Sequence, residues 1–333
     1  MKSLKKIAVI FIALLVLTYI GVTINSKNSG DNNIYVPPPK IPIQIDRTYQ
    51  VKFDLDENNI NIPSTVPVIS FNNSTPINIE EAQNIANNLE YTEAPQTVND
   101  VVDGTVYLWN NISGPLFVYA DIRKIDYSYA VPTTTIDKKF TNEDNIKIAR
   151  DFLESKFEYE SGEVEFAFTT YIDFSEGAYH GHSVPNKGIS TITQVNFTPS
   201  NANIKTLSLN PEASPVFVWI ANDGTIARAV ATKLSDVQTL DASINIKTIS
   251  EIKESANDAI IVSLDHGNID PYDIKPGEIQ EVKITQIELA YLLEKPEFRF
   301  LQPIIVYTGN TKIKGHGKEG LIDVTLYLTA QKK

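Results

Sequence analysis

One pattern recurs three times along this 333-residue chain: a short amphipathic helix pattern followed by several strand patterns. The helix patterns cover 79–89, 142–156 and 249–259, where apolar residues recur at helical spacing. Segments rich in β-branched and aromatic residues follow each of them. Because a helix followed by antiparallel strands can bury its apolar stripe on one sheet face, the sequence predicts an α+β fold of helices packed on antiparallel sheets.

Each helix pattern begins at a residue suited to cap a helix. Asn78 precedes the first pattern, and its side chain can accept hydrogen bonds from free N–H groups of the first turn. Thr141 with Asp144, and Thr248 with Glu251, have the spacing of a capping box, in which two side chains satisfy each other's backbone N–H groups. These residues predict where the three helices begin.

The strand patterns divide the rest of the chain. They cover 49–55, 106–109, 116–123, 125–129, 163–174, 191–197, 216–221, 225–232, 281–292, 303–307 and 321–329. Asp223-Gly224 predicts a tight hairpin turn, because glycine adopts positive φ without strain. We therefore predict α+β modules at 46–135, 136–245 and 246–333, preceded by a proline-rich linker at 28–45.

The first 27 residues have the composition of a membrane segment. Lys2, Lys5 and Lys6 precede an uncharged, mostly apolar run at 7–24. The length of this run is at the short end of what crosses a bilayer, and the preceding lysines place the N-terminus in the cytoplasm. The sequence predicts a cytoplasmic tail and transmembrane anchor at 1–27, in a single-pass protein of the cell membrane with an extracytoplasmic body. A cleaved signal peptide is the alternative.

Charge and cysteine content exclude several classes of function. The chain has a net charge of −12, and the four lysines of the first 27 residues are the only charges there, so the remainder carries −16. Such an acidic surface argues against nucleic acid as a partner, because phosphates need lysine and arginine for neutralisation. With no cysteine, the chain has no disulfides, no thiol nucleophile and no zinc–thiolate site.

Histidines are the main candidates for chemistry. His180 and His182 stand two residues apart near Glu176, a spacing that places both side chains on one side of a strand and suggests a metal site. The alternative is a glycine-rich loop in which both histidines are merely exposed. His266 and His316 are lone histidines in turns. We therefore assign no catalytic, cofactor-binding or metal-binding residues and expect no cofactor.

Five aromatic residues in the strand patterns leave two interpretations open. Aromatic side chains at alternating strand positions are usually part of a core, but an exposed group of them marks a partner surface. The residues are Tyr127, Tyr129, Tyr171, Trp219 and Tyr307.

The chain from residue 142 onward has a serial arrangement with a specific ending. It runs from the helix pattern 142–156 through the strand segments 192–197 and 215–219 to ITQIELAYL at 284–292 and FLQPIIVYTG at 300–309. This arrangement resembles the YycH/YycI group, membrane-anchored regulators of bacterial two-component systems, and PepSY-like modules more broadly. The resemblance implies PepSY-like modules at 136–245 and 246–333, and a non-catalytic outer domain that binds a partner, classically a sensor kinase.

The resulting functional prediction is a protein-interaction domain without enzymatic activity. We expect it to regulate a membrane sensor kinase or an envelope enzyme, with the lipid bilayer as a second partner through the N-terminal helix. The alternative is a cell-wall-binding module or an envelope hydrolase, which would need a cleft with convergent polar groups.

Overall fold

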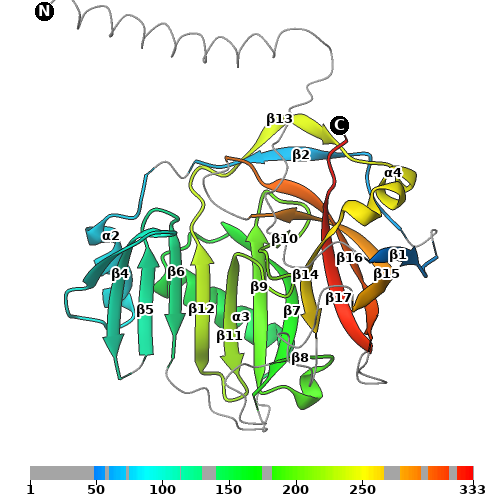
Figure 1. Ribbon diagram of the computed structural model, residues 1–333. Coiled ribbons are helices and arrows are strands. Elements are labelled where there is room, and N and C mark those ends of the chain that lie inside the picture. Colours follow the sequence, from blue (N-terminus) through cyan, green and yellow to red (C-terminus); the bar gives the residue numbers. More distant parts are fainter. Residues whose placement is uncertain are drawn as a thin grey trace, which may run out of the picture.

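The structure is a computed structural model, and it describes residues 49–56, 60–72, 75–112, 114–129, 140–174, 182–265, 278–293, 299–314 and 321–332. Strands dominate this part of the chain: seventeen strands accompany three α-helices and two short 3-10 helices. The strands form two large sheets and one two-stranded ribbon (Figure 1).

The first large sheet has nine strands, all paired antiparallel. Its strands are, in spatial order, β3 (Gln96–Asp100), β4 (Gly104–Asn111), β5 (Gly114–Tyr119), β6 (Lys124–Ser128), β12 (Ile226–Thr232), β11 (Val216–Ala221), β9 (Ile192–Pro199), β7 (Val164–Asp173) and β8 (His182–Val184). The central pairing of β6 with β12 joins strands that are about a hundred residues apart in sequence, so the sheet is assembled from two separate stretches of chain.

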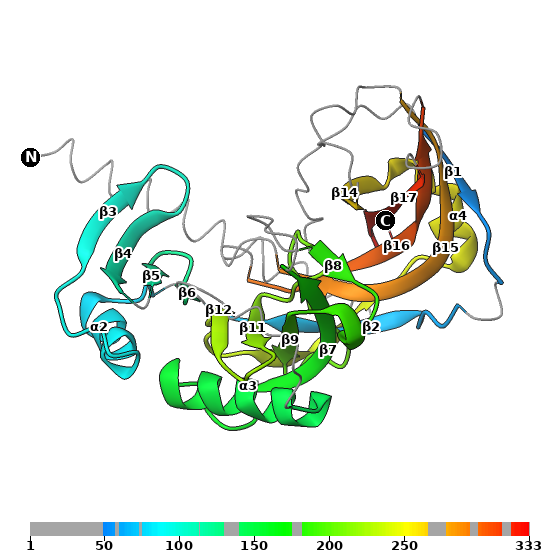
Figure 2. The same ribbon diagram turned by 90° about the horizontal axis from the view of Figure 1, so that it is seen from below.

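Helices α2 (Ile79–Asn88) and α3 (Asn142–Lys156) cover one face of this sheet (Figure 2). Ala82 and Ile85 of α2, and Ala149 and Leu153 of α3, are fully buried against apolar side chains of the sheet. Thr141 and Asp144 form the capping box expected at the start of α3. The expected cap Asn78 also accepts hydrogen bonds from two N–H groups of α2.

The second large sheet has β15 (Ile279–Leu292) and β16 (Gln302–Ile313) at its centre. Its other strands are β1 (Gln50–Phe53), β17 (Leu321–Thr329), β14 (Ile260–Asp265) and β10 (Thr206–Leu207). Both β1 and β10 pair parallel with β15, and the remaining pairs are antiparallel. The short helix α4 (Ile249–Glu254) packs on this sheet, where the Tyr307 hydroxyl donates to the Ile252 carbonyl at 2.8 Å.

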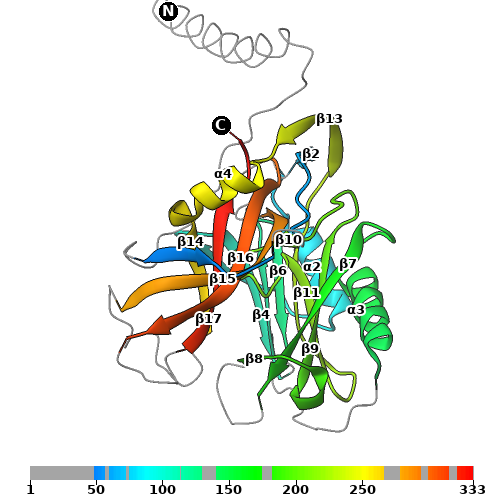
Figure 3. The same ribbon diagram turned by 90° about the vertical axis from the view of Figure 1, so that its right-hand side faces the viewer.

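The two large sheets pack against each other with the helices outside (Figure 3). Apolar side chains of β10, β15, β16 and β17 form a buried cluster that includes Phe168 of β7 in the other sheet. The ribbon of β2 (Thr65–Ser70) and β13 (Gln238–Asn245) crosses above one end of both sheets (Figure 1). The architecture is a β-rich sandwich.

The predicted α+β fold class is therefore wrong. The three expected helices exist, although the third is only six residues long, with a 3-10 turn (Ala256–Asp258) after it. Strands β2, β3, β8, β10, β13 and β14 were not predicted, and they shift the balance to β structure. Most of these pair with remote segments or are too short for alternation, so local periodicity does not reveal them.

The predicted single-pass anchor finds no support in the structure. No helix within the described ranges is long and apolar enough to cross a membrane. The predicted segment at 7–24 itself lies outside the described residues, as does the linker at 28–45. We therefore correct the expected cell-membrane localisation and do not carry the anchor or the bilayer partner further.

The predicted module boundaries stay predictions. Strands from both sides of the boundary at 135/136 pair within the nine-stranded sheet, through β6 and β12. Strands β1 and β2, which belong to the predicted first module, pair with β15 and β13. Residues 130–139, on either side of the first boundary, are outside the described part of the chain.

Candidate functional site

A surface hollow of about 540 Å³ lies where three loops meet at one end of the nine-stranded sheet. The loops connect α3 to β7, β9 to β10, and β12 to β13. The lining residues are Arg123, Glu158, Glu160, Ser161, Gly162, Glu163, Ser200, Asn201, Lys233, Leu234, Ser235, Asp236 and Val237. A volume of this size falls in the range of small-molecule and side-chain binding sites.

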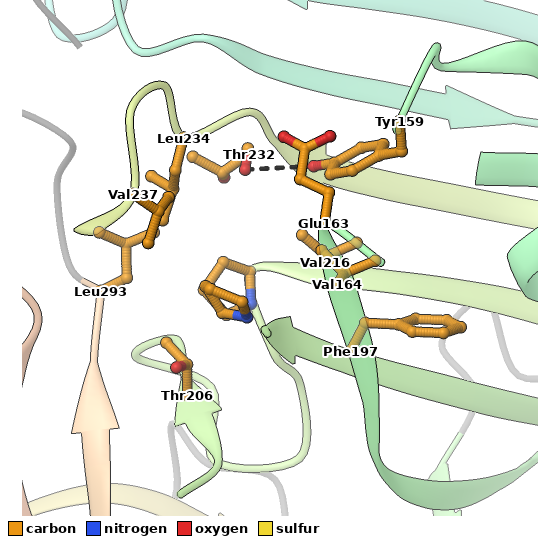
Figure 4. Close-up of a pocket in the computed structure, with 12 residues that line it drawn as sticks. Tyr159, Glu163, Val164, Phe197, Thr206, Val216, Thr232, Leu234, Val237 and Leu293 are labelled. Atoms are coloured by element: carbon orange, nitrogen blue, oxygen red, sulfur yellow. Dashed lines mark hydrogen bonds between the residues drawn. The ribbon is translucent and has the colours of Figure 1, made fainter. Parts of the chain in front are cut away.

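An apolar cavity of about 20 Å³ adjoins the hollow (Figure 4). The two share Glu163, Leu234 and Val237, so the cavity forms an apolar floor beneath the polar rim. The cavity lies between the ends of β7, β9, β11 and β12 on one side and β10 and the end of β15 on the other. Its volume is close to the minimum that holds one water molecule.

The loop after α3 supplies most of the carboxylates of the hollow. Glu158 follows the helix at φ 57°, and Gly162 has φ 83°, so the chain reverses direction within a few residues. Between them, the Glu160 N–H donates to Glu163 Oε2 at 3.0 Å, and the Glu163 N–H donates to the Glu160 carbonyl at 3.0 Å. These bonds fix the turn that carries the carboxylates.

The guanidinium of Arg123 connects separate segments of the chain next to the hollow. Its guanidinium donates to the Thr75 carbonyl at 2.8 Å and to the Lys233 carbonyl at 3.2 Å, and it pairs with Glu81 at 3.4 Å. The residue is 8% exposed. Because its donors are directed at three separate segments, Arg123 positions the β12–β13 loop and contributes little free positive charge to the hollow.

Left-handed backbone conformations gather at this site. Among the described residues, four that are not glycine have positive φ, and three of them line the hollow: Arg123, Glu158 and Asp236. Each such residue costs of order 1 kcal/mol or more and persists only where the surrounding structure determines it. Backbone strain of this kind clusters at functional sites. We therefore treat this hollow as the candidate functional site.

Tyr159 closes the cavity with a hydrogen bond. Its hydroxyl donates to the Thr232 carbonyl at 3.3 Å (Figure 4), and the residue is 5% exposed. Burial, and then the negative charge of Glu163, raise the pKa of the Tyr159 hydroxyl. The hydroxyl therefore stays protonated and acts as a fixed donor, while the Lys233 ammonium lies 5.8 Å from the ring centroid.

Negative charge predominates around the hollow. Four carboxylates line it, from Glu158, Glu160, Glu163 and Asp236, against the two cations Arg123 and Lys233. Arg123 is already paired with Glu81, outside the hollow. Glu158 accepts a hydrogen bond from the Asn88 amide at 3.1 Å. The hollow is thus suited to a cationic group with an adjoining apolar part.

The lining offers groups for binding. It contains three serines, several carboxylates and a lysine, and no histidine or cysteine stands among the lining residues. Within the described ranges, no group of three or more histidine, aspartate or glutamate side chains is placed to hold a metal ion.

No family model matches this chain. No curated protein matches it either. Among solved structures, an uncharacterized protein from Eubacterium rectale ATCC 33656 aligns with a TM-score of 0.46 at 11% identity, over 86% of this chain and 90% of that one. Nothing in these comparisons supports the YycH/YycI-like or PepSY-like character that the sequence suggests, and we do not carry that resemblance further.

Of the four histidines in the sequence, only His182 lies within the described residues. His182 begins β8, where its backbone pairs with Asp173. His180, His266 and His316 lie outside the described residues. The idea of a metal site at His180 and His182 therefore remains a prediction.

The five aromatic residues divide between core and surface. Tyr307 is fully buried, and Tyr127 is packed against the core beneath α2 and α3. Tyr129 is 41% exposed. Tyr171 accepts a hydrogen bond from the Asn142 amide at 2.8 Å, and Trp219 donates to Gln194 at 2.6 Å on the sheet face opposite the helices. None of the five lines the hollow.

Sequence reasoning missed the residues of the hollow. One local signal was present: the acidic, glycine-containing run 158–163 between a predicted helix and a predicted strand. The partners that complete the site, at 200–201 and 233–237, come from loops that only the assembled sheets bring close. Their proximity has no signature in sequence spacing.

Proposed function

We propose that this chain is a non-catalytic binding domain that holds a cationic, partly apolar segment of a partner protein in the hollow. The observation that carries the proposal is the combination of an acidic rim with an apolar floor. Glu158, Glu160 and Asp236 supply charge at the rim, and Leu234 and Val237 lead to the floor. Such a site matches a lysine or arginine side chain with an apolar neighbour.

The charge of the rim contributes more to the choice of partner than to the binding affinity. Exposed ion pairs contribute only about 0.2–1 kcal/mol each, and salt screens them over roughly 10 Å. Binding through this rim therefore weakens as ionic strength rises. Complementary charge mainly speeds association and rejects acidic partners. In this proposal the partner is an enzyme or sensor kinase that the bound domain regulates.

A peptide-binding experiment tests the proposal. A short fluorescent peptide of lysine, leucine and glycine is titrated with the full chain at low salt, next to the same peptide with glutamate in place of each lysine. We expect only the cationic peptide to bind. The double variant Glu160→Lys with Asp236→Asn should weaken binding about fivefold or more, because about 1 kcal/mol of electrostatic attraction is lost. Asparagine is chosen at position 236 because it tolerates positive φ.

Asp258→Lys is the control for charge and adds two of the three positive charge units that the double variant adds. It introduces the same change as Glu160→Lys at an exposed acidic residue of the 3-10 turn after α4, outside the hollow. It should leave peptide affinity unchanged. Equal weakening by both variants would mean that the peptide responds only to overall charge, and cleavage of the peptide would contradict a non-catalytic role.

A further inference from the structure

Strand β3 forms a free edge of the nine-stranded sheet. It pairs with β4 on one side, and no other described strand lies along its outer side (Figure 2). All five of its residues are exposed. Three of the features that protect edge strands are absent from β3, since it contains no lysine and no proline and its pairing with β4 has no bulge; it is, however, short and ends in the charged Asp100.

The direction of the outer hydrogen-bonding groups follows from the neighbouring strand. Both backbone groups of Thr105 are engaged away from β3: its N–H donates to Asp121 Oδ2 and its carbonyl accepts from the Ala120 N–H. Because alternate residues of a strand point to opposite sides, Val106 faces β3 and exchanges hydrogen bonds with its partner Val98. Strand β3 therefore points the N–H and carbonyl groups of the residues on either side of Val98 outward.

The exposed edge is complementary to a second copy of itself. Placed antiparallel about Val98, Thr97 of one copy lies opposite Asn99 of the other, so the outward groups of both residues pair. The same register places Gln96 opposite Asp100, an amide facing a carboxylate. Val98 meets Val98 of the second copy at a non-hydrogen-bonded position, where side chains come closest.

We propose that two copies of this chain associate through β3 and join their nine-stranded sheets across a two-fold axis. A two-fold contact is closed, so association stops at the dimer. The contact uses one short strand from each copy, and interfaces this small are weak or transient.

Charge near the hairpin makes the dimer sensitive to salt. The Asp100 carboxylate accepts hydrogen bonds from the N–H groups of Val102 and Asp103 in its own hairpin, and these bonds lower its pKa, so it stays charged. Each copy also carries a net charge of −12, so the two copies repel each other at low salt. Because like charges repel and salt screens them, dimerisation should strengthen as ionic strength rises. Binding to the acidic hollow has the opposite salt dependence.

Single-cysteine variants test the register directly, because the chain has no cysteine of its own. In Val98→Cys, the two thiols of the proposed dimer face each other across a close antiparallel pair, at a separation that permits a disulfide. Val102→Cys is the control: Val102 is 70% exposed against 49% for Val98 but lies outside the pairing. Under mild oxidation of the full chain, we expect a covalent dimer from Val98→Cys at least tenfold faster than from Val102→Cys.

A second substitution separates pairing from random collision. Adding Asn99→Pro to Val98→Cys removes an outward N–H and leaves the hydrogen bonds between β3 and β4 in place, so it should slow disulfide formation to the rate of the control. Equal rates for Val98→Cys and Val102→Cys, or no effect of the proline, would overturn the proposal. An added peptide strand that binds at β3 should block the crosslink. Without that peptide, Val98→Cys should still form the dimer.

Discussion

Buried tyrosines link distant parts of this chain, which has no disulfide to do so. The hydroxyl of Tyr49 donates to the Ala259 carbonyl at 2.8 Å, and that of Tyr291 donates to the Pro67 carbonyl at 2.6 Å. Each bond joins elements more than two hundred residues apart in sequence. Leaving a buried carbonyl without its donor costs about 1–3 kcal/mol of stability. The stability of the sandwich therefore depends on each of these tyrosine hydroxyls.

Tyr91 gives a prediction about alkaline stability. It is 3% exposed and donates to the Gly114 carbonyl at 2.9 Å, and burial, followed by the nearby Tyr127, raises its pKa to about 12. An unfolded tyrosine has a pKa of about 10. Between these values the folded state binds more protons, so the free energy of unfolding falls as pH rises from about 10 to 12, by about 2 kcal/mol from this residue.

Tyr91→Phe tests this prediction through urea unfolding between pH 8 and 12. At pH 8 the variant should be about 1 kcal/mol less stable, because the hydrogen bond to Gly114 is lost. Its stability should then fall less steeply above pH 10 than that of the parent chain. Tyr129→Phe, at a 41% exposed position, is the control and should follow the parent curve. Parallel curves for Tyr91→Phe and the parent would contradict the assignment.

The roles of some residues could be predicted from the sequence, and those of others could not. The caps Asn78, Thr141 and Thr248 were predictable, because capping depends on neighbours within three residues. The left-handed conformation of Arg123 was not, since arginine does not signal positive φ and the contacts that hold this residue come from other segments.

At the scale of elements, the pairing of β15 with β16 contains a close backbone approach. A register shift between Ile284 and Gln286 leaves Thr285 as an extra residue opposite Gly309. A Cβ atom added at Gly309 would lie 2.1 Å from the Lys283 carbonyl oxygen. Both partners are backbone, so little movement can relieve the overlap.

Gly309→Ala should therefore strongly destabilise the second sheet. We expect a loss of about 3 kcal/mol in the free energy of unfolding, measured by urea denaturation, because overpacking against backbone forces the strands apart. Gly162→Ala is the matched comparison. Its Cβ would meet nothing within 4 Å, so only its φ of 83° opposes alanine and the expected loss is about 1 kcal/mol. A smaller loss at position 309 than at 162 would contradict the described packing.

The long elements were predictable and the edge elements were not. The boundaries of α3, β11 and β17 match the sequence prediction because each has a strong apolar pattern. Strand β3 is exposed throughout and has no alternation to detect. Strand β13 is recognisable only through β2, about 170 residues away, so no local window reveals it.

For the whole molecule, the order of strands in space differs from their order in sequence. Residues 46–135, the first predicted module, contribute strands to all three sheets. Strands β1 and β2 lose their partners β15 and β13 when this segment stands alone, and β6 loses β12. The predicted α+β architecture assumed local pairing within each module, and the β-rich sandwich arises because distant strands pair instead.

This interleaving predicts that residues 46–135 do not fold by themselves. The isolated fragment should show no cooperative thermal transition and little protection of amide hydrogens, whereas the full chain should show both, because the core beneath α2 and α3 is shared with β9, β11 and β12. A cooperative transition in the fragment would support an independent module and contradict a shared core.

Hydrogen exchange of the full chain, with and without the cationic peptide, tests the proposed binding function most directly. We predict that the peptide slows exchange in the three loops of the hollow, at 158–163, 200–201 and 233–237, and that the change disappears in Glu160→Lys with Asp236→Asn. Peptide binding that protects only other segments, or that leaves these loops unchanged, would contradict the assignment of the hollow as the binding site.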